Sequence, residues 1–147
     1  MEYFTFRSYS PGKNLKEIST PLSVACGGGC CSIHSRPVHH CNAIWDTGAT
    51  SSMISRRIAR ELQLHSTGTV EISGVHGVNS ANTYIVDLLF ACGFTIPGLR
   101  VSEADDGGGF DVLIGMDVIS RGRLTVDGLG DGCHITFAFP AEGAETI

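Results

Sequence analysis

The chain has 147 residues and a mass of 15.6 kDa, which suits one domain of about 150 residues and excludes a two-lobed enzyme carrying two copies of a catalytic half. Charged residues make up 17% of the chain and 19 residues are glycine, so the composition favours a folded, turn-rich β protein over a disordered one. The net charge of −5 argues against a nucleic-acid partner, because nucleic-acid-binding surfaces are basic.

No segment of the sequence predicts a membrane partner. The first seven residues lack the basic start and the long apolar run of a signal peptide. The most apolar stretch, residues 84–94, contains Asp87 and is shorter than the roughly 20 residues of a membrane span. The six cysteines are too few for a secreted disulfide scaffold. We therefore expect a cytoplasmic protein with reduced thiols.

Short strands are predicted along most of the chain. Residues 1–20 are interpreted as an N-terminal extension, residues 21–140 as the domain and residues 141–147 as a polar tail. In the extension Phe4 and Phe6 alternate with polar residues, which allows one short strand. Apolar runs bounded by glycine, proline or polar residues predict further strands at residues 22–26, 31–34, 38–45, 69–72, 84–91, 94–101, 110–114, 124–126 and 134–139.

One segment has the periodicity of a helix. Ile54, Ile58 and Leu62 recur every four residues, and arginines lie between them. This spacing predicts an amphipathic helix of two to three turns over residues 55–64. A single further turn of helix is predicted over residues 116–119. The fold class is therefore mostly β, with one main helix.

Two short motifs stand at the ends of apolar strands. Asp-Thr-Gly-Ala occupies residues 46–49, directly after the strand that ends at Trp45. Alone it indicates no more than a turn, because Asp and Gly are common turn residues. The predicted helix follows within a few residues, and about sixty residues downstream the apolar pair Leu113-Ile114 ends in Gly115.

This order of motifs resembles the retropepsin-like aspartic proteases over roughly residues 22–140. The Gly-Met-Asp sequence at residues 115–117 is closer to bacterial and retroelement members than to viral ones. Viral members often carry an ion pair between an Asp at the position of Thr50 and an Arg at the position of Met116, and this chain has neither. The resemblance implies a closed antiparallel β barrel that forms a two-fold homodimer.

The chemistry of this class requires two neighbouring carboxylates that share one proton. The chain contains a single Asp-Thr-Gly; Asp127 and Asp131 each precede a glycine directly, without the threonine. One chain therefore supplies half of the pair. The resemblance implies that two Asp46 residues meet across the axis of a homodimer, and that the monomer is inactive.

The resemblance also implies roles for the residues around Asp46. Thr47 would hydrogen-bond across the dimer axis, Gly48 would let the partner carboxylate approach, and Ala49 would leave room for the substrate backbone. Leu113, Ile114 and Gly115 would brace this loop. A flap that folds over the peptide would consist of Ser73, Gly74, Val75, His76 and Gly77.

The implied function is an aspartic endopeptidase that needs no cofactor and cleaves extended, mainly apolar peptide segments. One alternative is a retropepsin-fold dimer that binds proteins or peptides without cleaving them, although a pure binding module has no need for Asp46. Another is a metal or redox site formed by the cysteines and histidines of residues 26–41. Their spacing matches no common zinc pattern, and strand alternation separates His39 and Cys41 from His40, so no metal is expected.

Overall fold

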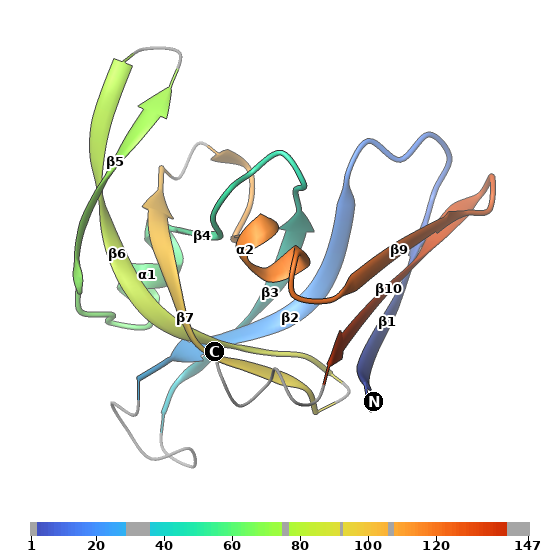
Figure 1. Cartoon of the computed structure of the whole chain (residues 1–147), viewed down its shortest axis with the longest axis horizontal. Coiled ribbons are helices and arrows are strands. Elements are labelled where there is room, and N and C mark those ends of the chain that lie inside the picture. Colours follow the sequence, from blue (N-terminus) through green and yellow to red (C-terminus); the bar gives the residue numbers. More distant parts are fainter. Residues whose placement is uncertain (1–2, 29–35, 75–76, 92, 106–107, 141–147) are drawn as a thin grey trace.

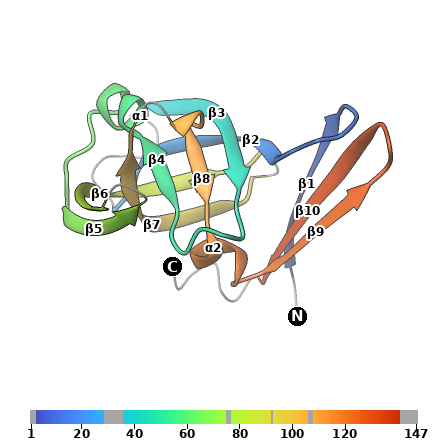
Figure 2. The ribbon, with the colours of Figure 1, turned by 90° about the horizontal axis from the view of Figure 1, so that it is seen from above.

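The computed structural model describes residues 3–28, 36–74, 77–91, 93–105 and 108–140. These residues form ten strands and two short helices (Figures 1 and 2). In chain order the elements are β1 (Tyr3–Pro11), β2 (Ile18–Cys26), β3 (Val38–Trp45), β4 (Met53–Ser55), α1 (Arg56–Glu61), β5 (Gly68–Gly74), β6 (Gly77–Leu89), β7 (Thr95–Ala104), β8 (Val112–Ile114), α2 (Met116–Ile119), β9 (Arg123–Gly128) and β10 (Gly132–Pro140). The expected mostly β fold is confirmed, while the strand expected at residues 31–34 lies outside the described residues.

The larger sheet has the strand order β2-β3-β8-β4-β7-β6-β5, and β2 also pairs with β6. Each of the strands β2, β3, β8, β4, β7 and β6 therefore has a hydrogen-bonded neighbour on both sides. The β3–β8 and β4–β7 pairs are parallel and the other pairs are antiparallel. The first part of β6, residues 77–83, pairs with β5 as a hairpin. This hairpin projects beyond the rest of the sheet in Figure 1.

A second sheet contains both ends of the described chain. β1 pairs with β10 over its whole length, and β10 pairs in turn with β9. This sheet lies to one side of the larger one in both views. Phe6 of β1 is only 2% exposed and its ring lies 5.0 Å from that of Phe90, so the N-terminal strand contributes to the common core.

Buried residues at the end of β3 fix the position at which the Asp-Thr-Gly-Ala segment begins. Along β3 the side chains of Ala43 and Trp45 are buried. The Trp45 indole N–H donates to the buried Thr20 hydroxyl at 2.8 Å, which satisfies the polar atom of this core residue. The end of β3 is thereby fixed, and Asp46 follows immediately.

The main helix is shorter than its periodicity predicts. Ile54 belongs to β4, and the Ser55 hydroxyl caps α1 by accepting the Ile58 N–H at 3.3 Å. The helix ends after Glu61, and Gln63 adopts a left-handed conformation with φ of 51°. The prediction of two to three turns over residues 55–64 is wrong, because Ser55 belongs to β4 and residues 62–63 form a turn. No helix in the described part of the chain is long and apolar enough to cross a membrane.

The expectation of reduced thiols is wrong for Cys26, which is disulfide-bonded. Cys41 and Cys133 are free. A cysteine count could not predict this bond, because a disulfide depends on two Cα atoms coming within about 7 Å in the fold.

Candidate active site

Asp46 opens a loop of residues 46–52, here named the active loop, which connects β3 to β4. The Asp46 N–H donates to the Ile114 carbonyl at 2.9 Å. Its carboxylate Oδ1 accepts the Gly48 N–H at 2.8 Å, and its carbonyl accepts the Ala49 N–H at 3.2 Å. These bonds hold the partly buried carboxylate in a fixed orientation, while Thr47 beside it is exposed.

Gly48 and Gly115 both lie where neighbouring atoms leave little room for a Cβ. A Cβ on Gly48 would stand 3.1 Å from Asp46 Oδ1, tighter than an ordinary contact. A Cβ on Gly115 would stand 2.8 Å from the Ser51 carbonyl carbon and 2.9 Å from the Ala49 carbonyl oxygen. Backbone atoms cannot move aside as a side chain can, so only glycine fits at position 115 without displacing the active loop.

Residues 113–117 pair with the strands on both sides of the active loop and hydrogen-bond to the loop itself. In β8, Leu113 pairs with both Ile44 of β3 and Met53 of β4, while the fully buried Ile114 pairs with Trp45. Beyond β8, the Met116 N–H donates to the Ala49 carbonyl at 2.8 Å and the Asp117 N–H donates to the Thr50 carbonyl at 3.2 Å. The expected bracing segment thus lies directly against the Asp-Thr-Gly-Ala segment.

Two supporting residues were missed by sequence reasoning. The Asp117 carboxylate accepts the Ser52 N–H at 2.9 Å, the Ser52 hydroxyl at 2.7 Å and the Val118 N–H at 3.0 Å. The fully buried Ser52 hydroxyl in turn accepts the Gly115 N–H at 3.0 Å. The available signal was Asp117 itself, an acid in the first turn of a short helix, where it can accept backbone N–H groups.

A cleft separates the active loop from the β5–β6 hairpin. Its volume is about 490 Å³. The active loop contributes Ala49, Thr50 and Ser51 to its lining, β4 contributes Met53, the hairpin contributes Val70, Glu71, Ile72, Ser73 and Thr83, and β7 contributes Arg100, Val101 and Ser102. The expected flap falls at the end of this hairpin, where Ser73 pairs with Val78 and Gly74 with Gly77. Val75 and His76 lie outside the described residues.

A comparison with protein families shows the family of the chain. A family model described as aspartyl protease matches residues 31–118, more than half of the chain and including both motifs. The chain belongs to the aspartyl protease family.

One solved structure shares the fold, and two others are similar to parts of it. A retropepsin-like aspartic protease from Rickettsia conorii covers 95% of this chain and 98% of its own, with 12% identity and a TM-score of 0.56. Simian foamy virus (mac) protease has 15% identity over 69% of this chain and 92% of its own, with a TM-score of 0.43. The retroviral protease-like domain of Ddi1 from Leishmania major has 21% identity over 72% and 80%, with a TM-score of 0.43. No curated protein matches this chain.

The two histidines of β3 have separate partners. His39 Nδ1 lies 2.9 Å from Glu61 Oε2, and His40 Nδ1 lies 2.5 Å from Ser23 Oγ. The described residues contain no group of three His, Cys, Asp or Glu side chains that could hold a metal ion. Of the residues considered for such a site, Cys30, Cys31 and His34 lie outside the described part.

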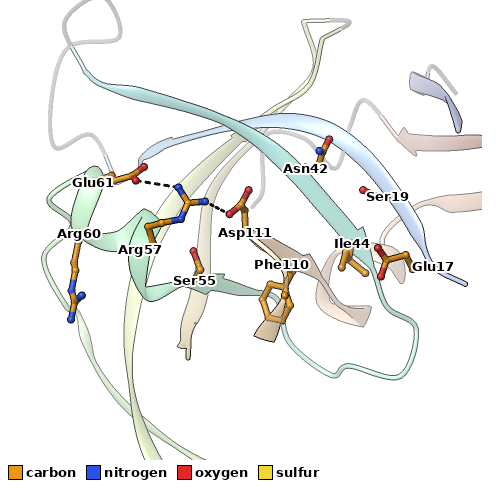
Figure 3. A pocket seen from close by; sticks show the side chains of 11 residues that line it. Glu17, Ser19, Asn42, Ile44, Ser55, Arg57, Arg60, Glu61, Phe110 and Asp111 are labelled. Atoms are coloured by element: carbon orange, nitrogen blue, oxygen red, sulfur yellow. Dashed lines mark hydrogen bonds and ion pairs between the residues drawn. The ribbon is translucent and has the colours of Figure 1, made fainter. Parts of the chain in front are cut away.

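A larger cavity of about 730 Å³ lies between α1, β3 and residues 109–111 (Figure 3). Arg57 forms ion pairs there with Glu61 at 3.1 Å and with Asp111. Burial, reinforced by the Asp111 carboxylate and opposed by Arg57, raises the pKa of the nearby Cys41 thiol to about 12. No described residue lines both this cavity and the cleft beside the active loop, so the two are separate, and Asp46 lines neither.

Proposed function

We propose that the protein is an aspartic endopeptidase whose active site contains two Asp46 carboxylates, one from each protomer of a homodimer. The observation that carries the proposal is the support of Asp46. Its carboxylate accepts the Gly48 N–H, and the active loop is hydrogen-bonded to residues 115–117 beside a cleft that can hold a peptide. The family match supports the same chemistry.

The proposed reaction uses water directly, without a covalent intermediate. Two like charges that lie close together cannot both ionise, so one Asp46 carboxyl keeps a proton while the other is ionised. The ionised carboxylate takes a proton from the water as its oxygen attacks the peptide carbonyl carbon. The protonated carboxyl gives its proton to the carbonyl oxygen. The result is a tetrahedral gem-diol that is not bonded to the protein. As its C–N bond breaks, the carboxyl that took the water proton gives it to the amine nitrogen, and the other carboxylate takes a proton from a gem-diol hydroxyl, which restores the starting pair.

The substrate is proposed to be an extended, mainly apolar peptide segment. Such a segment would lie as an added strand between the β5–β6 hairpin and the active loop. Met53, Val70 and Ile72 supply apolar surface to this cleft. The proposal includes a closed barrel as the rigid support of the site. The pairing of β2 with β6, which joins the two ends of the strand order β2-β3-β8-β4-β7-β6, supports it. The proposed flap, Ser73, Gly74, Val75, His76 and Gly77, would exclude water during the reaction.

The test compares the wild-type protein with an Asp46→Asn variant on a diverse peptide pool between pH 3 and pH 7. Each protein is assayed with and without a transition-state-type inhibitor of aspartic proteases. Asp131→Asn is the matched control, because this exposed carboxylate precedes a glycine in the turn before β10, outside the site.

We expect cleavage by the wild type and by Asp131→Asn, blocked by the inhibitor, and none by Asp46→Asn. Equal cleavage by wild type and Asp46→Asn would contradict the proposal. Peptide binding by a proven dimer that cleaves nothing would instead support the alternative of a silent binding module.

A further inference from the structure

The cleft beside the active loop has two charged side chains among its lining residues, Arg100 on β7 and Glu71 on β5. The other lining residues are apolar or carry hydroxyl groups. A charged side chain in a binding cleft discriminates between ligands by charge as well as by shape. The position of each of these two charges therefore bears on which peptides fit.

Arg100 lies on the open face of β7. Its neighbours Leu99 and Val101 are 4% and 1% exposed and face the core. Successive side chains of a strand point to opposite faces, so the exposed Arg100 shares its face with Ser102, which also lines the cleft. The guanidinium is thus carried by a strand paired with β4 and β6.

The two charges do not neutralise each other. Arg100 stands opposite Ile85 of β6, whereas Glu71 stands opposite Ser80 of the same strand. Five residues along a strand correspond to about 17 Å, and no ion pair joins these two described side chains. Other arginines of the chain, Arg36, Arg56 and Arg57, each have a carboxylate partner.

We infer that Arg100 makes the cleft select peptides that carry an acidic side chain at an outer position, several residues from the bond that is cut. The inference rests on the proposed function, because it takes this cleft as the substrate site. A planar guanidinium binds a carboxylate through two parallel N–H···O bonds. The Ser102 hydroxyl on the same face offers a further donor.

Glu71 does not share the face of Arg100. Paired residues of neighbouring strands lie on one face and successive residues alternate, so Glu71, the partner of Ser80, points to the opposite face from Arg100, the partner of Ile85. Val70 and Ile72 of β5 share the face of Arg100, and the preference for acid therefore comes from the β7 end of the cleft. In the proposed homodimer the two-fold axis repeats the cleft, so an acidic position is selected on each side of the cut bond.

The experiment starts from a peptide that the wild-type protein cleaves. Glu, Gln and Lys are placed in turn at each of four positions on either side of the cut bond, and kcat/KM is measured for every peptide. The protein variants are Arg100→Gln and Arg100→Glu. Arg123→Gln is the matched control, because it removes an exposed arginine from β9 in the other sheet.

At one outer position on each side, we expect the wild type to cleave the Glu peptide about three- to tenfold faster than the Gln peptide. This ratio falls to about one in Arg100→Gln, reverses in favour of Lys in Arg100→Glu, and persists in Arg123→Gln. Added salt reduces the ratio, because the charges are exposed to solvent. Cleavage with no difference between Glu and Gln at any position, or a ratio that survives Arg100→Gln, would overturn the inference.

A binding measurement separates this inference from the proposed catalysis. Fluorescently labelled Glu, Gln and Lys peptides are titrated against Asp46→Asn protein with and without Arg100→Gln, and binding is followed by anisotropy. Tighter binding of the Glu peptide that requires Arg100 supports the inference even if the wild type cleaves nothing. Equal binding of Glu and Gln peptides counts against the inference while leaving the endopeptidase proposal to its own test.

Discussion

At the scale of single residues, a small hydrogen-bond network holds the active loop against residues 115–117. Ser52 occupies the centre of this network, since it donates twice to Asp117 and accepts the Gly115 N–H. Buried polar groups are costly to leave unpaired. The network therefore links the stability of the fold to the position of Asp46, six residues before Ser52.

Replacing Asp117 with Ala removes the acceptor for the Ser52 N–H and hydroxyl. We expect the free energy of unfolding to fall by about 1–3 kcal/mol, and kcat to fall more than KM rises, because the active loop loses a support that is not a substrate contact. Urea denaturation and steady-state kinetics measure the two effects. Asp127→Ala, an exposed change on β9, serves as the control. An Asp117→Ala protein with unchanged stability and kcat would show that the network does not position the loop.

The Cys41 thiol gives a prediction about pH. Its pKa is raised to about 12 in the folded chain, against an ordinary value of 9.0. Between these values the unfolded chain releases the proton and the folded chain keeps it, so stability decreases as pH rises through this range.

We expect the decrease in the free energy of unfolding above pH 9 to be smaller in Cys41→Ala than in the wild type, as measured by urea titrations at several pH values. Thiol reagents at pH 8 should react with Cys41 only after unfolding. Rapid labelling of one more thiol in the native wild type than in native Cys41→Ala would contradict this prediction.

Site residues that belong to short sequence motifs could be predicted from the sequence, whereas residues that hydrogen-bond across long sequence separations could not. Asp46 and Gly115 were proposed from the sequence because each follows an apolar strand in a short recognisable pattern. The Ser52–Asp117 contact joins residues 65 positions apart, and only the fold reveals it. The Cys26 disulfide was missed for the same reason.

At the scale of elements, strands were predicted better than helix ends. β3 and α2 have the predicted ranges of residues 38–45 and 116–119, because apolar alternation and a preceding glycine define them. The main helix was overextended chiefly at its end, because the apolar spacing continues to Leu62 and Leu64 whereas the chain turns at Gln63. The alternation of Phe4 and Phe6 indicated a strand in residues 1–20, but its partner β10 lies at the opposite end of the described chain.

The pairing of β1 with β10 leads to a prediction about stability. Phe6→Ala should lower the free energy of unfolding by about 3–5 kcal/mol, because a ring that is 2% exposed leaves a cavity in the core. Phe4→Ala is the matched control on the same strand, since its ring is 47% exposed, and its effect should be clearly smaller. Urea denaturation measures both. Equal, small effects would mean that β1 is an appendage rather than part of the core.

At the scale of the whole molecule, the central claim is that one chain contributes half of an active site. The described chain contains one Asp-Thr-Gly, supported by a network that lies within one protomer. The Rickettsia conorii protease shares the fold over nearly all of both chains. A homodimer with two Asp46 carboxylates at its axis is the arrangement that we propose to complete the site.

The measurement that tests this claim most directly mixes wild-type protein with the Asp46→Asn variant. The wild-type concentration is held constant, increasing amounts of the variant are added, subunits are allowed to exchange, and cleavage of one peptide is followed. If each active site needs two Asp46 carboxylates, mixed dimers are inactive, and an equal amount of variant lowers the rate to about half by random pairing. Asp131→Asn added in the same way should increase the rate. A cleavage rate that stays constant as Asp46→Asn is added would show that one chain is sufficient for catalysis and would contradict the shared active site.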